Sequence, residues 1–296
     1  MTAETATDAT IAYPPRRRGG GRVVRTTLRY ALLTFCSAVI LFPLYITVVN
    51  SLLPVSKIAG RPPTFVPVEP QWSNYADAWN QGSLGRAITV SVVMSMLIVA
   101  GQVLTSLLAG YAFAFLAFPL KRTIFVIFLA TMMIPFEVIF VSNRQVMSDI
   151  PVLGINLYDT YAALALPFLA TGFGAFLLRQ AFLTVPSDLR DAARLDGFGH
   201  LRFLFRIALP LVRPTLAALV VFSFLSAWAQ YLWPLVITGE GHETVQLALA
   251  NLKNRNISTV NVTFAATVIA TLPLAALLIV FQKQLVRGLT AGAVKG

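Results

Sequence analysis

The sequence predicts an all-α integral membrane protein with about six transmembrane helices. Apolar residues make up 57% of the 296 residues and charged residues only 12%, which is about half the charged share of a soluble domain. The apolar residues form blocks of about 18 to 30, long enough for a helix to cross roughly 30 Å of hydrocarbon. The run from Ile124 to Leu129 also lacks the apolar and polar alternation of a β-barrel strand.

Each apolar block predicts one membrane-spanning helix. The blocks run from Tyr30 to Val49, Ala87 to Leu116, Thr123 to Val141, Tyr161 to Leu178, Leu216 to Ile237 and Phe264 to Phe281. Together they predict a transmembrane domain over residues 26–296. Residues 1–25 carry consecutive prolines, arginines and glycines, a composition that cannot bury a core and predicts a disordered, basic cytoplasmic tail.

The net charge of +11 would suggest nucleic acid in a soluble protein, but the positions of the basic residues predict topology instead. With a cytoplasmic N-terminus, 17 of the 23 basic residues fall in the inner segments. This asymmetry follows the positive-inside rule and predicts that both termini are cytoplasmic. We therefore expect contact with membrane lipid and no nucleic-acid partner.

Sequence motifs for chemistry are scarce. The chain has no G-x-x-x-x-G-K-[ST] phosphate loop, so it cannot hold ATP in the usual way. His200 and His242 fall on opposite sides of the membrane in this topology and cannot share a metal ion. Cys36 is the single cysteine, and no nucleophile with a neighbouring base is evident. We expect no cofactor on this chain and no catalytic residue.

The segment between the fourth and fifth spans is the most informative. After Pro186, Ser187 is positioned to cap a short helix that runs through Leu195, and Asp196-Gly197 predicts a turn before a second helix. Leu189, Ala192 and Ala193 would form a small apolar face. Such a helix could lie on lipid headgroups or insert into a groove on a soluble partner, and spacing does not decide between the two.

The spacing of Asp191-Ala192-Ala193, Gly197, Ile207 and Leu209-Pro210 resembles the EAA signature of binding-protein-dependent ABC importer permeases, with Asp191 where that family has Glu. The tail from Phe281 to Gly296 resembles the MalG-type carbohydrate permeases. Ser226 to Leu235 is similar to their fifth span, with Ala229 in place of the usual Asn. Within the family, the stretches MIPFEV (Met133 to Val138) and AQYLWPL (Ala229 to Leu235) look most like the glycerol-3-phosphate permease branch.

This resemblance implies a type I, MetI-like bundle in a bacterial inner membrane. It implies that Asp191, Ala192, Ala193, Asp196 and Gly197 belong to a coupling helix, about residues 187–205, that docks on an ATPase subunit. The implied partners are a second permease, two ATPase subunits that bind ATP and magnesium, and an extracytoplasmic solute-binding protein. The expected function is import of a sugar or sugar-like solute, such as glycerol-3-phosphate or a glycerophosphodiester, by alternating access.

Four residues are candidates for the solute pathway. Glu137 is the clear acidic residue within a span and could line the pathway, or reach water and pair with Arg144. Trp228, Gln230 and Tyr231 combine aromatic faces with polar groups that suit a sugar. The alternative for these aromatic residues is an interfacial belt, which would suit Trp233 best.

Two other classes of protein compete with the importer. An ion-coupled secondary transporter would work without an ATPase, but such proteins place ionisable groups near the midplane and often show repeated halves. Glu137 is the single candidate for such a group here, and no internal repeat is evident. A membrane-embedded enzyme would need a catalytic cluster, which the sequence does not offer.

Overall fold

The computed structural model describes residues 20–290 except 59, 82, 151–153 and 256–258. The described chain is helical, with one isolated β-bridge between Ile150 and Ile155. The helices are α1 (Gly20–Ser51), α2 (Val55–Ile58), α3 (Ser73–Gln81), α4 (Leu84–Phe115), α5 (Lys121–Ala130), η1 (Thr131–Met133), α6 (Phe136–Ser148), α7 (Tyr161–Ala165), η2 (Leu166–Phe168), α8 (Gly172–Phe182), α9 (Ser187–Leu195), α10 (His200–Phe203), the π-helical η3 (Leu204–Ala208), α11 (Leu209–Leu211), α12 (Arg213–Trp228), α13 (Leu232–Ile237), α14 (Val245–Arg255) and α15 (Val260–Thr290).

The chain divides into two units at Ile46, and each is described by itself. The described part of the first unit is the apolar helix α1 as far as Ile46, and the last turn of α1, up to Ser51, belongs to the second unit. Because α1 begins at Gly20, it includes the last residues of the predicted tail. Residues 1–19 of that tail lie outside the described residues. The predicted first span lies inside the 28-residue apolar stretch from Val24 to Ser51.

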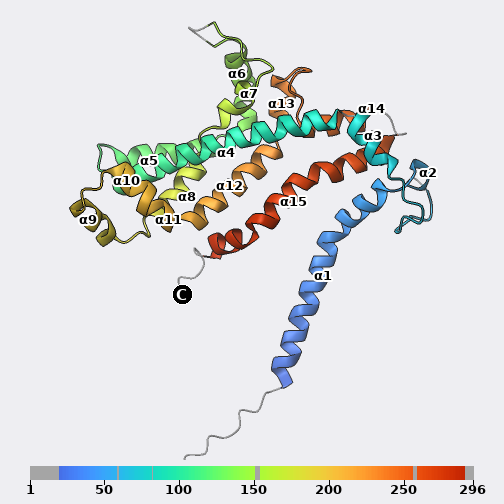
Figure 1. Cartoon of the computed structure of the whole chain (residues 1–296), viewed down its shortest axis with the longest axis horizontal. Coiled ribbons are helices and arrows are strands. Elements are labelled where there is room, and N and C mark those ends of the chain that lie inside the picture. Colours follow the sequence, from blue (N-terminus) through green and yellow to red (C-terminus); the bar gives the residue numbers. More distant parts are fainter. Residues whose placement is uncertain (1–19, 59, 82, 151–153, 256–258, 291–296) are drawn as a thin grey trace, which may run out of the picture. The chain divides into compact units, whose positions relative to one another are not determined.

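The second unit is built around the 32-residue helix α4, which packs along α8 and α12, while α12 also packs along α15 (Figure 1). Small residues allow the α4 and α8 backbones to approach closely, as expected in lipid. A Cβ atom added to Gly110 would lie 2.9 Å from the Leu178 side chain, and one added to Gly174 would collide with Ser106.

Three predicted spans are broken rather than continuous helices, which corrects the sequence-based reading. The third bends by 96° between Met133 and Phe136, where Pro135 cannot continue the hydrogen-bond pattern of α5. The fourth bends by 50° between η2 and α8, after a turn that contains Pro167. In the fifth, α12 ends at Trp228 and α13 starts at Leu232.

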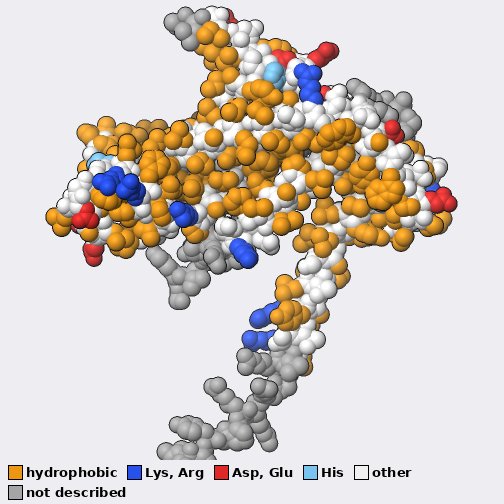
Figure 2. Space-filling model, in the orientation of Figure 1, with side chains coloured by type: hydrophobic (Ala, Val, Ile, Leu, Met, Phe, Trp, Pro, Cys, Tyr) orange, Lys and Arg blue, Asp and Glu red, His pale blue; other side chains and the backbone are white. Residues whose placement is uncertain are grey.

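The length and composition of the helices fit a multi-pass membrane protein. Three described helices are long and apolar enough to cross a membrane, and the number rises to six if each bent pair counts as one span, including His200–Leu211 with Arg213–Trp228. Figure 2 shows hydrophobic side chains across the face over α4, α12 and α15, with charged side chains toward its edges. An apolar surface of this extent needs a non-aqueous environment.

Candidate functional site

The segment from α9 to α10 forms a compact elbow, and its turn is set by Gly197. The Phe198 N–H donates to the Ala193 carbonyl at 2.8 Å, and the Gly197 N–H donates to the Arg194 carbonyl at 3.0 Å. These two bonds form a Schellman motif, which satisfies carbonyl groups at the end of α9. Gly197 has φ +73°, which a residue with a Cβ adopts only at a cost.

The α9 helix has one face buried in the bundle and one face exposed. Ala193 is 4% exposed and belongs to an apolar cluster with Tyr111 of α4, Phe182 of α8 and Phe203 of α10. Ala192 and Asp191 are exposed, and Leu195 is 91% exposed. The predicted apolar face of Leu189, Ala192 and Ala193 is therefore split between the core and the surface.

The charged side chains of α9 form long, solvent-exposed ion pairs. The Asp191 carboxylate lies 3.7 Å from Arg190 Nε and 3.9 Å from Arg194 Nη1, and its side chain is 60% exposed. Exposed pairs of this kind contribute about 0–1 kcal/mol to stability. Asp196 is also exposed, so both carboxylates are available to another molecule.

The start of α9 corrects one prediction. Ser187 does not cap the helix, because its hydroxyl donates to the Asp188 side chain at 3.3 Å and Pro186 occupies the cap position without a side-chain bond. On the bundle side, the Tyr111 hydroxyl lies 3.0 Å from His200 Nδ1. The elbow is therefore fastened through Ala193, Phe198 and His200 and not through its first residue.

A cavity of about 520 Å³ lies where the broken spans meet. It is lined from α4, α6, η2, α12, α13 and the break between α12 and α13, by Ile98, Gln102, Phe136, Glu137, Phe140, Phe168, Ser226, Ala227, Ala229, Gln230, Tyr231, Leu232 and Trp233. The bend at Pro135 brings the first turn of α6, with Glu137, to this cavity. Glu137, Gln230 and Tyr231, which the sequence singled out, therefore all line this cavity.

The polar groups of the cavity are partly unpaired. The Gln230 side-chain oxygen is buried and has no hydrogen-bond partner among the described residues. Glu137 is exposed, and no ion pair joins it to Arg144 in the described chain, so the proposed Glu137–Arg144 pairing is not formed. Because a buried unpaired acceptor costs about 1–3 kcal/mol, the Gln230 amide favours a ligand that donates a hydrogen bond.

Gln102 is a cavity residue that the sequence reading missed. Its amide nitrogen donates to the Phe168 carbonyl at 2.9 Å, and its amide oxygen accepts from the Ser223 hydroxyl at 2.6 Å. It thereby links α4 with η2 and α12. The signal was present, because Gln102 is an amide inside a 32-residue apolar helix, and such polar residues in spans are usually functional.

The two tryptophans of this region lie where the sequence did not place them. Trp228 does not line the cavity, because its ring is 4% exposed and stacks on Phe224 at 5.5 Å between ring centroids. Trp233 is not part of an exposed belt, since it is 1% exposed and its indole N–H donates to the Ala163 carbonyl at 3.1 Å. Trp228 packs α12, whereas Trp233 forms a rigid cavity wall.

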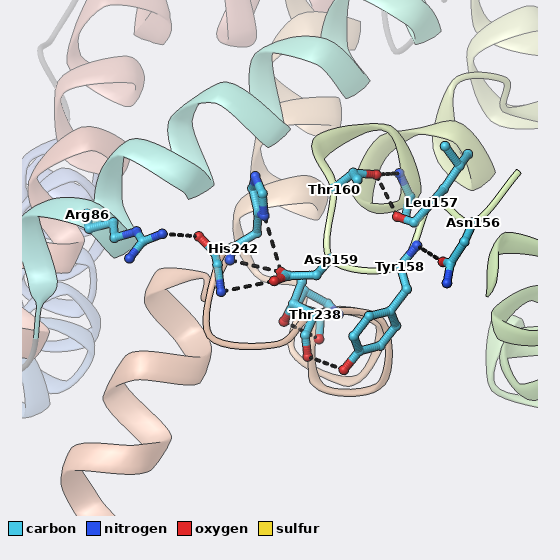
Figure 3. A network of polar contacts seen from close by, with 11 residues as sticks. Arg86, Asn156, Leu157, Tyr158, Asp159, Thr160, Thr238 and His242 are labelled. Carbon is cyan, nitrogen blue, oxygen red and sulfur yellow. Dashed lines mark hydrogen bonds and ion pairs between the residues drawn. The ribbon is translucent and has the colours of Figure 1, made fainter.

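A polar contact joins the loop before α7 to the loop after α13 (Figure 3). The Asp159 carboxylate accepts from the backbone N–H groups of Gly241 and His242, both at 3.0 Å, and lies 3.2 Å from His242 Nδ1. The Asp159 N–H donates to the Ile237 carbonyl at 3.0 Å, and Arg86 donates to the Gly241 carbonyl at 2.8 Å. We call Asp159 with residues 239–242 the clasp.

The hydrogen bonds of the clasp lower the pKa of the Asp159 carboxyl group. Partial burial alone would raise the pKa of Asp159, but the hydrogen bonds from the backbone of Gly239 and Gly241 and from His242 lower it below its ordinary value. The ionised form is therefore favoured by the folded chain. Sequence reasoning missed this site, since its partners are about 80 residues apart in the chain.

The family of the chain follows from comparison with known proteins. Residues 102–291 match the family model for the binding-protein-dependent transport system inner membrane component. This stretch covers more than half of the chain and includes the elbow and every lining residue of the cavity except Ile98. The chain belongs to this family, and it is therefore a membrane-spanning permease component of a binding-protein-dependent ABC import system.

Within this family, the chain is similar to permease proteins of one named transport system. The chain is 35% identical to the sn-glycerol-3-phosphate transport system permease protein UgpE of Yersinia pestis bv. Antiqua (strain Antiqua), over 84% of this chain and 90% of that protein. It is 32% identical to the protein of the same name from Rhizobium meliloti (strain 1021), over 90% of this chain and 97% of that protein.

Solved structures share the fold. A bacterial ABC transporter involved in the import of the acidic polysaccharide alginate has a chain that superposes with a TM-score of 0.76 at 20% identity, covering 90% of this chain and 98% of that one. A bacterial alginate ABC transporter in complex with an alginate pentasaccharide-bound periplasmic protein gives a TM-score of 0.65 at 14% identity, with 90% and 96% covered. The expected permease bundle is confirmed.

Proposed function

We propose that this chain is one of two permease subunits of an ATP-driven importer, and that α9 receives the movement of a separate ATPase subunit. The observation that carries the proposal is the two-sidedness of α9. Ala193 is buried against the ends of α4 and α8, while Asp191, Ala192 and Leu195 on the same helix are exposed. A force on the exposed face would reach the bundle through a packed contact, because packed cores transmit displacement.

The orientation and partners belong to the same proposal. Both termini would be cytoplasmic, which places the elbow where an ATPase can bind. The chain would pair with a second permease, two ATPase subunits that hold ATP and magnesium, and an extracytoplasmic solute-binding protein. The family membership and the separate alginate transporter with its periplasmic protein support this assembly.

The cavity supports a small hydroxylated solute. Tyr231 offers an aromatic ring and a hydroxyl, and the unpaired amide oxygen of Gln230 can accept from a solute hydroxyl. The named relatives make glycerol-3-phosphate or a glycerophosphodiester the first solutes to test. The described lining of this chain contains Glu137 and no Lys or Arg, so the cations for a phosphate group would come from the second permease.

The test uses the complete importer in liposomes, with ATP inside and binding protein outside, and measures uptake of labelled glycerol-3-phosphate together with ATP hydrolysis. We expect Asp191→Lys combined with Ala193→Leu to abolish uptake while much of the hydrolysis remains. Asp149→Lys, an equal charge change at an exposed site without a described side-chain bond, should leave both activities unchanged. Intact uptake in the double variant would rule out α9 as the coupling element.

Two further outcomes separate the alternatives. Solute accumulation by the chain alone, driven by an ion gradient, would instead establish the ion-coupled transporter. Uptake of a sugar but not of glycerol-3-phosphate would keep the importer and change the solute. Gln230→Leu should raise the solute concentration needed for half-maximal uptake about fivefold, since one hydrogen bond contributes about 1 kcal/mol.

A further inference from the structure

A second groove lies at the elbow end of the bundle, away from the cavity. It has a volume of about 480 Å³ and is lined from the C-terminal ends of α4 and α8 and along α5, by Phe113, Lys121, Arg122, Phe125, Val126, Leu129 and Arg179. The lining has two chemical parts. Three cations stand at the start of α5 and the end of α8, and apolar side chains of α5 form the remaining wall.

Two of the cations are held in place by the protein backbone. Lys121 Nζ donates to the Leu116 carbonyl at 2.8 Å and to the Ala114 carbonyl at 3.4 Å, at the C-terminal end of α4. Arg179 Nε donates to the Phe113 carbonyl at 3.2 Å, and its guanidinium lies 4.3 Å from the centroid of the Phe125 ring. Carbonyl dipoles and a ring face orient these groups but supply no full negative charge.

The three cations lack a counterion in the described chain. The ion pairs found among the described residues involve Asp191 and Asp159, and none involves Lys121, Arg122 or Arg179. The described residues that line the groove include no carboxylate. Like charges brought together beside an apolar wall repel each other through a medium of low dielectric constant, so an anion bound here would be strongly favoured.

The position of the groove identifies the kind of anion. Lys121 begins the apolar helix α5, whose Val126 and Ile127 side chains are 57% and 61% exposed. The cations therefore stand where an apolar span meets its polar end, at the depth of lipid headgroups. A phospholipid has a phosphate at this depth and an acyl chain that can follow the apolar wall, whereas a free anion would leave that wall in contact with water.

We propose that this groove binds an anionic phospholipid. The phosphate lies among Lys121, Arg122 and Arg179, and one acyl chain packs along Phe125, Val126 and Leu129. The proposal adds a lipid site to the proposed importer and relies on that proposal only for the cytoplasmic side of the elbow. Lipid binding is measured without transport, so the two proposals fail separately.

The test measures lipid retained by the purified importer after reconstitution into phosphatidylcholine vesicles with or without phosphatidylglycerol, using native mass spectrometry. We expect phosphatidylglycerol to bind the wild type in preference to phosphatidylcholine. Arg122→Gln should weaken this preference about fivefold, and Lys121→Gln with Arg122→Gln about 25-fold, because each cation near a membrane surface contributes about a fivefold factor. Lys283→Gln, at an exposed cation of α15 outside the groove, should change nothing.

The single variant Arg122→Gln shows whether a loss of lipid binding arises from the lost charge and not from misfolding. Arg122 is exposed and makes no described hydrogen bond or ion pair, whereas Lys121 also holds the end of α4. Equal retention of phosphatidylglycerol by the wild type and Arg122→Gln would overturn the proposal. It would also be overturned if millimolar inorganic phosphate displaced the bound lipid, or if the second permease, located by cross-linking from position 122, covered the groove.

Discussion

The elbow and the clasp lie at the two ends of the bent span formed by α7 and α8, and they are held by different forces. At the elbow, α9 is fixed by the burial of Ala193 and by backbone hydrogen bonds, while its charges face outward. At the clasp, the loop at Gly241 and His242 is fixed by one carboxylate turned inward. Apolar contacts tolerate sliding, whereas a carboxylate with several donors fixes one geometry.

The largest expected effect tests the apolar side of this comparison. Ala193→Leu adds volume to a packed cluster and should lower the free energy of unfolding by about 1–3 kcal/mol. Ala192→Leu, the same change at the adjacent exposed position, should stay within about 0.5 kcal/mol of the wild type. Thermal unfolding of the purified protein measures both. Equal destabilisation by the two variants would contradict the split between a buried and an exposed face.

The second effect tests the clasp. Asp159→Asn keeps the shape of the side chain but turns an amide NH₂ toward N–H donors, and we expect about 1–2 kcal/mol less stability in the loop. Hydrogen exchange at the Gly241 and His242 amides should become about five- to thirtyfold faster. Asp149→Asn, at an exposed carboxylate without a described side-chain bond, is the control and should not alter these amides.

The same carboxylate predicts a pH dependence. Because the folded chain lowers the pKa of Asp159, its stabilisation is fully present above the ordinary aspartate pKa, about 3.9. It is lost as the pH falls further, through the lowered pKa of the folded state. Protection of the Gly241 amide, corrected for intrinsic exchange, should decline in this acidic range in the wild type. Asp159→Asn should remove the part of this decline that Asp159 causes.

The smallest effect concerns the turn of the elbow. Gly197→Ala places a Cβ at φ +73°, with nothing within 4 Å of it, so the cost is backbone strain of about 1 kcal/mol. Gly199 has φ −73° and equally open surroundings, and Gly199→Ala should be close to neutral. The difference between the two unfolding midpoints isolates the effect of the turn. Identical midpoints would show that Gly197 does not need its left-handed conformation.

The sequence predicted the unbroken helices well and the broken ones poorly. The block from Ala87 to Leu116 corresponds to α4, because hydrophobicity and helix extend together there. In the block from Leu216 to Ile237, hydrophobicity continues while the helix stops at Trp228. Apolar composition reports which residues avoid water, but it does not report where backbone hydrogen bonding is interrupted.

The candidate site residues divide in a similar way. Glu137 and Gln230 were found because a polar side chain in an apolar block is visible in the sequence, and they do line one cavity. Asp159 was not found, since its role depends on donors that the fold brings from residues 241 and 242. Trp228 was assigned to the cavity by its type, but its direction depends on where α12 ends.

The bend at Pro135 affects how the hydrophobic segment of residues 121–148 can be probed by experiment. Residues 121–148 would count as one continuous helix by composition. Yet Lys121 lines the proposed lipid groove and Glu137 lines the cavity, on two helices that meet at 96°. A helical wheel drawn through the segment would mix two unrelated surfaces. If cysteines are introduced at successive positions and labelled, the helical period of the labelling should be interrupted at Ile134 and Pro135.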